Sequence, residues 1–424
     1  MRAVQRRIGH EAARGAALSY PPPAGGGRNG AVENDSPGAE RFISRSLASV
    51  PASGIRKFFD LLSTIDDVIS LGVGEPDYVT PEPIRRAALE SIEKGETHYT
   101  SNYGLLELRE ALSEEIETLY GVSYDPATEI VVTSGSSEAF DIALRSLIDD
   151  GDEVLCPDPS YVAYEPAVIM AKGRFRPVPT TAEHEFRLLA SDVSERVTEQ
   201  TKALLFGYPA NPTGATMDRA SLEAVAEVAA ANDLAVISDE LYARLTYEGE
   251  HTCFSSIEGM RDRTILIGGF SKTYAMTGWR IGWLAAPAPL AEAAMKVHQY
   301  VMMSAPTAAQ YAALAALRQG ESFVQEMLAE YDRRRRLMVD GLHAVGLPAF
   351  RPRGAFYAFP DIRPTGLDST TFSERLLAEE RVAVVPGSAF GACGEGFVRA
   401  CYASGYEQIE RALERIGRFV QRNR

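Results

Sequence analysis

The most informative part of this chain is the stretch Gly268-Gly269-Phe270-Ser271-Lys272-Thr273-Tyr274-Ala275-Met276-Thr277-Gly278-Trp279-Arg280-Ile281-Gly282. It follows a short apolar run and places Lys272 among glycines and hydroxyl side chains. Such a lysine is poorly suited to be a solvated surface charge, and burial would lower its pKa toward nucleophilic behaviour. Arg280 lies eight residues downstream, after Gly278, and its side chain can reach an anion bound near Lys272. The stretch therefore predicts a buried, reactive amine at Lys272.

Upstream of this stretch, short apolar runs alternate with helical patterns. The runs cover residues 129–133, 153–156, 202–206, 234–238 and 264–267, and helical patterns include those that end near Asp149 and that span 218–232. This alternation predicts an α/β fold in which a mostly parallel sheet is covered by helices on both faces. Ligand sites in such sheets lie at the carboxyl ends of the strands.

The pattern changes toward both ends of the chain. Residues 1–40 contain proline-rich and glycine-rich runs with little to bury, which predicts a disordered or low-complexity tail. After about residue 320, a long charged helix (322–344) precedes short strands at 356–359 and 382–385 and a terminal helix from Tyr406. We therefore expect a large domain over 86–321 and a smaller α+β domain over 322–424, completed by an N-terminal segment, 41–85.

Charge and cysteine usage exclude several classes of function. The net charge of −15 over 424 residues disfavours nucleic acid or an anionic membrane surface as the main partner, because both would repel the chain. No apolar run approaches the roughly 20 residues that a membrane helix needs. The four cysteines and six histidines lie far apart without metal-binding spacing, so we expect neither a disulfide framework nor a metal site. A soluble, cytoplasmic protein is the expectation.

Two further segments end apolar strands in polar residues. Residues 131–139 pass from strand to helix through small side chains, and free N–H groups there suit a phosphate, although Ser136 is equally well explained as an ordinary N-cap. Residues 234–242 place Asp239 at the end of a strand. There it is a candidate helix cap, metal ligand or partner of a protonated heterocyclic nitrogen, and position alone does not choose between these roles.

From about residue 55 to its end, the chain resembles the class I/II aminotransferases, the fold-type I enzymes that use pyridoxal 5'-phosphate and include the aspartate and aromatic aminotransferases. The resemblance rests on motifs in a common order: Ser70-Leu71-Gly72-Val73-Gly74-Glu75-Pro76-Asp77, His98-Tyr99 ahead of Gly104-Leu105-Leu106-Glu107-Leu108-Arg109, Tyr208-Pro209-Ala210-Asn211-Pro212-Thr213-Gly214, the Lys272 stretch, and Arg353-Gly354-Ala355-Phe356-Tyr357. It implies a large domain with a mostly parallel seven-stranded sheet flanked by helices, and a smaller α+β domain.

The resemblance also implies how the coenzyme ring would be bound. Lys272 would hold it as a Schiff base and would move the proton between the substrate α-carbon and the coenzyme. Asp239 would keep the pyridine nitrogen protonated. Tyr242 and Asn211 would hydrogen-bond the phenolic oxygen, and Tyr161 would stack on the ring face. From the residues alone, Tyr161 as a core aromatic and Asn211 as a turn residue remain alternatives.

The coenzyme phosphate and the substrate have their own implied partners. The phosphate would be bound by Ser136, Ser137, Ser271 and Arg280, and by Tyr99 of a second subunit, so that a homodimer is implied with residues 41–85 at the contact. Arg399 matches the arginine that grips the substrate α-carboxylate with a bidentate fork. Gly74 would lie beside that carboxylate, where a side chain would obstruct binding, and Asn211 would lie near it.

The predicted function is transfer of an amino group from an L-amino acid (aspartate, aromatic or other neutral) to a 2-oxo acid such as 2-oxoglutarate by a ping-pong mechanism. Gly269 stands where some relatives have serine, and Ser137 stands where a dicarboxylate-specific branch has lysine, so an aspartate-only enzyme is not expected. One alternative is a C–S lyase or related β/γ-elimination enzyme with the same coenzyme. The other is a non-catalytic coenzyme-binding regulator, which would carry a winged helix that residues 1–40 cannot form.

Overall fold

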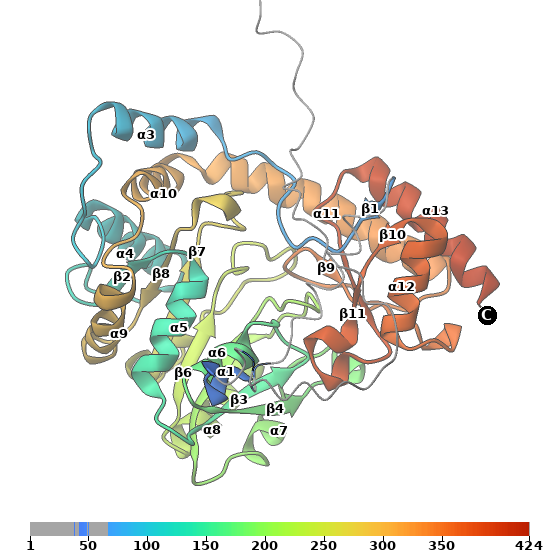
Figure 1. Cartoon of the computed structure of the whole chain (residues 1–424), viewed down its shortest axis with the longest axis horizontal. Coiled ribbons are helices and arrows are strands. Elements are labelled where there is room, and N and C mark those ends of the chain that lie inside the picture. Colours follow the sequence, from blue (N-terminus) through green and yellow to red (C-terminus); the bar gives the residue numbers. More distant parts are fainter. Residues whose placement is uncertain (1–37, 39–41, 49, 51–66, 424) are drawn as a thin grey trace, which may run out of the picture. The chain divides into compact units, whose positions relative to one another are not determined.

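A seven-stranded sheet forms the centre of the structure (Figure 1). Its strands are β2 (Ile130–Thr133), β3 (Glu153–Asp158), β4 (Arg174–Pro179), β5 (Thr201–Gly207), β6 (Ala235–Asp239), β7 (Thr264–Gly269) and β8 (Gly282–Ala285). They lie in the order β2-β8-β7-β6-β5-β3-β4. Strand β8 is antiparallel to its two neighbours, and the other adjacent strands are parallel. The predicted fold class, with its mostly parallel seven-stranded sheet, is confirmed.

The computed structural model describes residues 67–423, together with Gly38, residues 42–48 and Val50. The described residues from Ser44 onward belong to one compact unit, and of the residues before it only Gly38, Phe42 and Ile43 are described. The predicted tail therefore lies outside the described residues except for Gly38. So do residues 51–66 of the predicted N-terminal segment.

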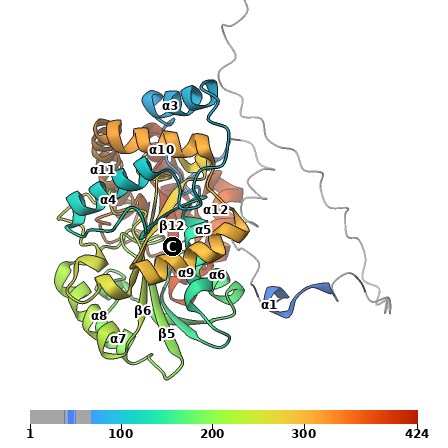
Figure 2. The ribbon, with the colours of Figure 1, turned by 90° about the vertical axis from the view of Figure 1, so that its left-hand side faces the viewer.

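Helices cover both faces of the sheet, and Figure 2 shows α7 and α8 on one side of β5 and β6 and α6 on the other. The helices of the first side are α7 (Ala190–Ser194), α8 (Arg219–Ala231), α4 (Leu106–Tyr120) and α10 (Thr307–Gln319), with α3 (Glu82–Glu93) packed on α10; those of the second are α5 (Ser136–Leu147), α6 (Tyr164–Met170) and α9 (Ala288–Val301). Because both faces of the sheet are covered, strand β5 has apolar side chains on both sides. Leu204 and Phe206 pack toward the first side and Ala203 and Leu205 toward the second, because successive side chains of a strand point to opposite faces.

Strands β4 and β8 are not indicated by the sequence pattern. Strand β4 is the edge strand, most of its residues are exposed or half-buried, and its two prolines cannot donate to a ladder. Strand β8 has only four residues and follows the Lys272 stretch directly. Strand β4 therefore lacks the apolar run by which the other strands are recognised, whereas β8 lies in an apolar run, residues 281–286, that begins inside the Lys272 stretch and contains one glycine and two alanines, residue types that are depleted in strands.

The C-terminal residues form a second group of strands and helices, drawn in orange and red in Figure 1. A three-stranded antiparallel sheet has the order β11 (Val385–Pro386), β12 (Val398–Cys401), β9 (Tyr357–Ala358), and it is accompanied by α11 (Glu321–Ala344), α12 (Ser369–Glu380) and α13 (Tyr406–Arg422). Strand β1 (Ile69–Ser70) pairs in parallel with β10 (Val382–Ala383). Residues that precede the large sheet thus join the C-terminal group, while a domain boundary at residue 321 stays a prediction.

The expectation of one strand over residues 382–385 is wrong. Val382 and Ala383 belong to β10 and pair with β1, whereas Val385 belongs to β11 and pairs with Arg399 of β12. The two halves of the run meet partners from opposite ends of the chain, so no single ladder continues through Val384.

The remaining helices are short. They are α1 (Arg45–Ala48) and the 3-10 turns η2 (Ala182–His184), η3 (Phe254–Ser256), η4 (Arg261–Arg263), η5 (Thr277–Trp279), η6 (Arg363–Thr365), η7 (Gly387–Phe390) and η8 (Ala392–Gly394). Within the described part of the chain, no helix is both long and apolar enough to cross a membrane.

Gly268 provides a test of the packing between β7 and β8. It lies opposite Trp283, and a Cβ at this position would collide with the indole ring. We expect Gly268→Val to lower the free energy of unfolding by about 1–3 kcal/mol, more than the roughly 1 kcal/mol by which strands favour valine. Urea denaturation measures the change. Gly278→Val is the matched control, because a Cβ there meets no atom within 4 Å; equal effects of the two substitutions would contradict the packing argument.

Candidate active site

A cavity of about 200 Å³ lies at the carboxyl ends of β5 and β6, where parallel sheets bind ligands. Eight residues singled out from the sequence line it: Gly74, Ser136, Tyr161, Asn211, Asp239, Tyr242, Lys272 and Arg399. They come from both the large sheet and the C-terminal group. A larger cavity of about 460 Å³ near His251 contains none of these residues. Among its charged side chains, Arg187 pairs with Asp218 and Arg353 with Glu185, so the smaller cavity is the better candidate.

Lys272 brings a partly buried amine into the cavity. Strand β7 ends three residues before it, and its Nζ donates a hydrogen bond to the carbonyl of Gly74 at 2.6 Å. Burial lowers the pKa of Lys272 to about 8. The Cys401 thiol and Glu75 act against this shift, and the positive charges of Arg399 and Arg280 add to it. At pH 7 roughly a tenth of this amine is therefore unprotonated, far more than of a solvated lysine.

Asp239 ends β6 as a buried carboxylate, only 8% exposed. Its Oδ2 accepts a hydrogen bond from the hydroxyl of Tyr164 at 2.8 Å, and its Oδ1 accepts one from the N–H of Leu241 at 3.0 Å. Burial raises the pKa of Asp239 to about 6, and these hydrogen bonds oppose the shift. The described residues after β6 form a turn, so the helix-cap interpretation is wrong. Within the described residues, no group of three or more His, Cys, Asp or Glu could hold a metal ion.

Arg399, in β12, is a buried guanidinium whose hydrogen bonds go to uncharged oxygens. Its Nη1 donates to Oδ1 of Asn211 at 2.8 Å and its Nη2 to the carbonyl of Gly72 at 2.7 Å, whereas its Nε is buried without a partner. The rings of Tyr357 and Phe390 lie 4.6 Å and 4.8 Å from its central carbon. Because no carboxylate among the described residues neutralises this buried positive charge through a hydrogen bond, the site favours an anionic ligand.

The N-terminus of α5 forms an anion seat beside the cavity. Gly135 is the N-cap, with a φ of 80°, so Ser136 opens the helix and the interpretation of Ser136 as an N-cap is wrong. A Cβ on Gly135 would lie 2.5 Å from Nη2 of Arg280, which places that guanidinium against the helix end. Free N–H groups, the helix dipole and a cation together suit a phosphate.

Tyrosine side chains and Gly74 surround the middle of the cavity. The hydroxyls of Tyr242 and Tyr357 are hydrogen-bonded at 2.7 Å. A Cβ on Gly74 would lie 2.5 Å from the Tyr357 hydroxyl, so a side chain there has no room. Tyr161 is half-buried and meets Tyr164 edge-on at 5.6 Å. Tyr161 is thus a wall of the cavity rather than a core aromatic, and Asn211 lies in a turn and also binds Arg399.

The other predicted residues lie outside the cavity lining. Ser271 is buried next to Lys272, and Ser137 is an exposed residue in the first turn of α5. Tyr99 is 79% exposed and does not reach the cavity of its own chain.

Sequence reasoning missed Tyr164, Tyr357 and Phe390, which contact Asp239, Tyr242 and Arg399. Tyr164 follows Tyr161 by three residues, a spacing that points to a shared environment at the start of a helix. Tyr357 ends the motif Arg353-Gly354-Ala355-Phe356-Tyr357, which supports the family resemblance but assigns no role to the tyrosine. No local signal marks Phe390, because its contact with Arg399 exists only once β11 and β12 have paired.

Comparison with known proteins adds independent information. A family model described as aminotransferase class I and II matches residues 66–416. An aspartate aminotransferase of Pyrococcus abyssi is 47% identical, and an aromatic-amino-acid aminotransferase 2 of Thermococcus litoralis is 46% identical; each alignment covers 89% of this chain and 98% of the relative. The crystal structure of an aromatic aminotransferase from Pyrococcus horikoshii superposes with a TM-score of 0.83 at 49% identity, covering 86% of this chain and 99% of that one.

The buried amine of Lys272 provides a test by pH. Burial disfavours its ammonium form, so the folded, ligand-free protein should lose this proton near pH 8 and the unfolded chain near the ordinary value of 10.5. Trace acetylation with acetic anhydride, followed by mass spectrometry of the Lys272 peptide, measures the neutral fraction. We expect the midpoint of the folded profile about 2.5 pH units below that of the same peptide in urea. Coincident profiles would show that the amine is solvated.

Proposed function

Because this chain belongs to the class I and II aminotransferase family, we propose that the cavity around Lys272 is where it transfers amino groups between amino acids and 2-oxo acids. Enzymes of this family use pyridoxal 5'-phosphate, and the chain is a transaminase dependent on that coenzyme. The observation that carries the proposal is the convergence of one amine, one carboxylate and one guanidinium on a single small cavity. The elimination activity considered above is not favoured, because the relatives are named aminotransferases.

The residues present fit the coenzyme at both of its ends. The anion seat at the start of α5, with Arg280 against it, suits the phosphate, and Ser136, Ser137 and Ser271 lie at or beside that seat. Asp239 suits the protonated ring nitrogen, because a cationic partner offsets the free-energy cost of burying its negative charge. The amine of Lys272 would hold the coenzyme covalently. When bound, the coenzyme withdraws electrons from the substrate α-carbon.

Lys272 is the residue that we assign to proton transfer. A pKa near 8 lets its amine accept or give up a proton at neutral pH with little energetic penalty. Its hydrogen bond to the Gly74 carbonyl holds Nζ on the side of the cavity formed by residues 72–74. The same amine can therefore serve both halves of a ping-pong cycle.

Arg399 is the residue that we assign to the substrate α-carboxylate. Asn211 and Gly72 fix the plane of its guanidinium, and because these two bonds use only two of its five N–H donors, and Nε has no partner among the described residues, donors remain for a ligand. Gly74 keeps the adjoining space free of a side chain. When the coenzyme is bound, Tyr161 would form an aromatic wall beside its ring, and Tyr242, held by Tyr357, would offer its hydroxyl to the phenolic oxygen.

The substrates that we propose are aspartate, aromatic or other neutral amino acids, with a 2-oxo acid such as 2-oxoglutarate as acceptor. The relatives named above include an aspartate and an aromatic-amino-acid aminotransferase, which supports this range. Ser137 in place of a lysine removes one cation that would select a second carboxylate, and Gly269 leaves Ser271 as the one serine of the Lys272 stretch that is assigned to the phosphate.

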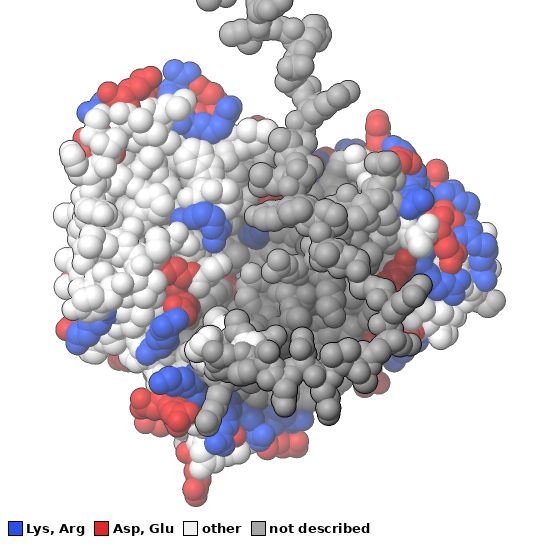
Figure 3. Space-filling model, in the orientation of Figure 1, with Lys and Arg blue, Asp and Glu red and all other residues white. Residues whose placement is uncertain are grey.

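We further propose that the protein is a homodimer in which Tyr99 completes the phosphate site of the second subunit. Tyr99 is 79% and Tyr300 is 86% exposed, and Val301, Met302 and Met303 continue this exposed apolar set. Figure 3 shows a broad, weakly charged area where Figure 1 places α4, α9 and α10. Exposed aromatic and methionine side chains of this kind are typical of subunit contacts.

Substitution of Lys272 tests the catalytic assignment. Lys272→Ala should lower turnover by about 10⁴-fold or more, since covalent attachment and proton transfer are both lost, while the protein still binds the coenzyme noncovalently. Coupled assays with amino acid and 2-oxoglutarate measure turnover, and Lys296→Ala, an exposed lysine in α9, is the control. Loaded wild-type protein whose absorbance stays constant with every amino acid would refute the proposal.

Mixed dimers test the assignment of Tyr99. Tyr99→Phe should weaken coenzyme affinity about tenfold through the loss of a hydrogen bond to a charged group. Mixing Tyr99→Phe with inactive Lys272→Ala should create dimers that hold one fully native site, so that tight binding and activity return. Sedimentation should show twice the chain mass of 46.1 kDa. A monomer, or mixtures without recovery, would contradict the shared site.

A further inference from the structure

Asp158, the last residue of β3, is a buried carboxylate that does not line the cavity. Its oxygens accept hydrogen bonds from the N–H groups of Ala392 and Cys393, each at 3.2 Å. Burial raises the pKa of Asp158, and these two hydrogen bonds offset that shift only in part. Because burying a carboxylate costs free energy, we expect Asp158 to stabilise the segment to which it is hydrogen-bonded.

Asp158 and its neighbour Ser160 fasten the loop that contains η7 and η8. The N–H of Ser160 donates to the carbonyl of Phe390 at 2.9 Å, which adds a third hydrogen bond between the two segments. Gly391 has a φ of 134°, and a Cβ there would collide with the carboxylate of Asp158. The loop can approach the end of β3 this closely only because residue 391 is glycine.

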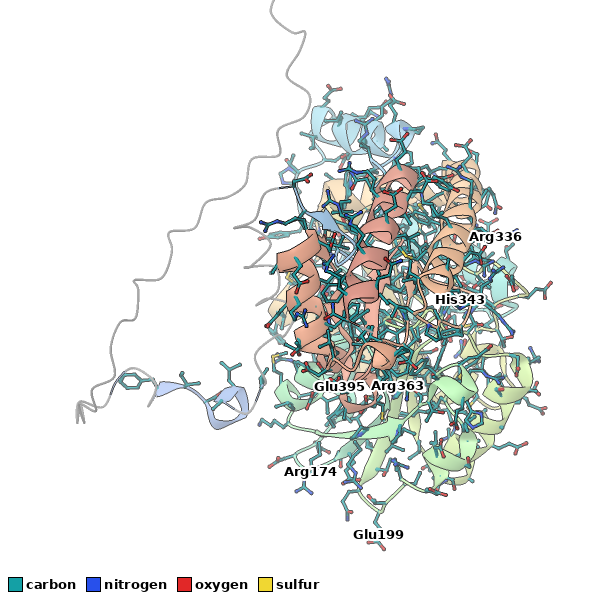
Figure 4. All side chains as sticks on the ribbon, turned by 90° about the vertical axis from the view of Figure 1, so that its right-hand side faces the viewer. Arg174, Glu199, Arg336, His343, Arg363 and Glu395 are labelled. Carbon is teal, nitrogen blue, oxygen red and sulfur yellow. The ribbon has the colours of Figure 1, made fainter. Side chains whose placement is uncertain are left out.

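The far side of the same loop is fastened to the C-terminal helices. Glu395 accepts hydrogen bonds from the N–H and the hydroxyl of Ser369, at 2.8 Å and 2.7 Å, at the start of α12. Figure 4 labels Glu395 and Arg363 near the end of these helices that faces the strands carrying Arg174. The loop therefore bridges the large sheet and the C-terminal group, with Asp158 as its attachment on the sheet side.

The loop carries the aromatic ring on which Arg399 rests. Phe390 is 4% exposed, and its ring centre lies 4.8 Å from the central carbon of the Arg399 guanidinium. Tyr357 covers that carbon at 4.6 Å, so two aromatic rings restrict the guanidinium. Together with the hydrogen bonds to Asn211 and Gly72, the position of Phe390 therefore limits the directions in which the free donors of Arg399 can point.

We propose that Asp158 is a positioning residue for substrate binding: through the loop and Phe390, it keeps Arg399 aligned with the substrate carboxylate. This inference rests on the proposed function in one respect, the assignment of Arg399 to that carboxylate. The segment after Asp158 also carries Tyr161, so the end of β3 aligns the wall of the coenzyme site and the substrate clamp together.

The first test is Asp158→Asn in the coenzyme-loaded enzyme. The amide replaces one acceptor oxygen by an N–H group that faces a backbone N–H, so one hydrogen bond is lost. We expect the KM for the amino acid to rise about tenfold while kcat changes less than about twofold. Asp152→Asn is the matched control, because Asp152 adjoins the opposite end of β3 and accepts a hydrogen bond from the N–H of Asp149.

The decisive comparison uses phenylalanine and 2-phenylethylamine, which differ only by the carboxylate. In single-turnover reactions followed by absorbance, Asp158→Asn should slow the reaction of phenylalanine about tenfold at limiting concentration and leave that of the amine within about twofold. A general structural defect would slow both reactions equally. Equal slowing, or no change with either substrate, would overturn the inference.

A second variant, Phe390→Leu, tests the same inference if Asp158→Asn does not fold. Phe390→Leu keeps an apolar side chain but removes the ring face, and it should show the same loss restricted to phenylalanine. If neither variant shows the restricted loss while the wild type reacts with amino acids, the positioning role is refuted and the proposed function stands. A wild-type protein that reacts with no amino acid would refute the proposed function, and this inference with it.

Discussion

Burial of charged groups in one small cavity is the constraint on which the rest of this structure depends. Lys272 and Arg399 bring two cationic groups and Asp239 one anionic group into about 200 Å³. Burial lowers the pKa of Lys272 to about 8 and raises that of Asp239 to about 6, so that both lie near neutral pH. Groups with such values exchange protons readily. The excess of positive charge also explains why the cavity suits an anionic coenzyme and a carboxylate substrate.

The fold brings these groups together through strand ends and one crossing segment. Asp239 ends β6 and Lys272 follows β7. The loop that carries Lys272, residues 270–281, connects β7 to its antiparallel neighbour β8, so the sheet holds both of its ends. The segment after β1 fixes the middle of that loop, because the Thr80 hydroxyl donates to the carbonyl of Ala275 and Trp279 donates to Thr80. The same segment also contributes Gly72 and Gly74 to the cavity lining.

A second layer of contacts holds each functional side chain. Tyr164 orients Asp239, and since burial raises the pKa of Tyr164 well above 10, its phenol keeps the proton that it donates. Asn211 plays the corresponding part for Arg399. Such contacts pre-organise a site before any ligand arrives, because the orienting bonds are already formed. They draw on β3, β5, β6 and β12 together, which makes the site a property of the whole described unit.

Local chemistry by itself determined the strands β2, β3, β5, β6 and β7, the helix α8 after Asp218, and the importance of Lys272, whereas Arg399 and the role of Asp239 came from the resemblance to the family. The strands, the helix and Lys272 follow from apolar runs, helical patterns and residue types that act over a few positions. Tertiary structure alone decided the split of residues 382–385 between two sheets, the capping of α5 by Gly135, and the contacts of Tyr164 and Phe390. The physical reason is that each of these depends on a partner distant in the chain, whose approach is fixed by packing and strand register and leaves no mark on the neighbouring sequence.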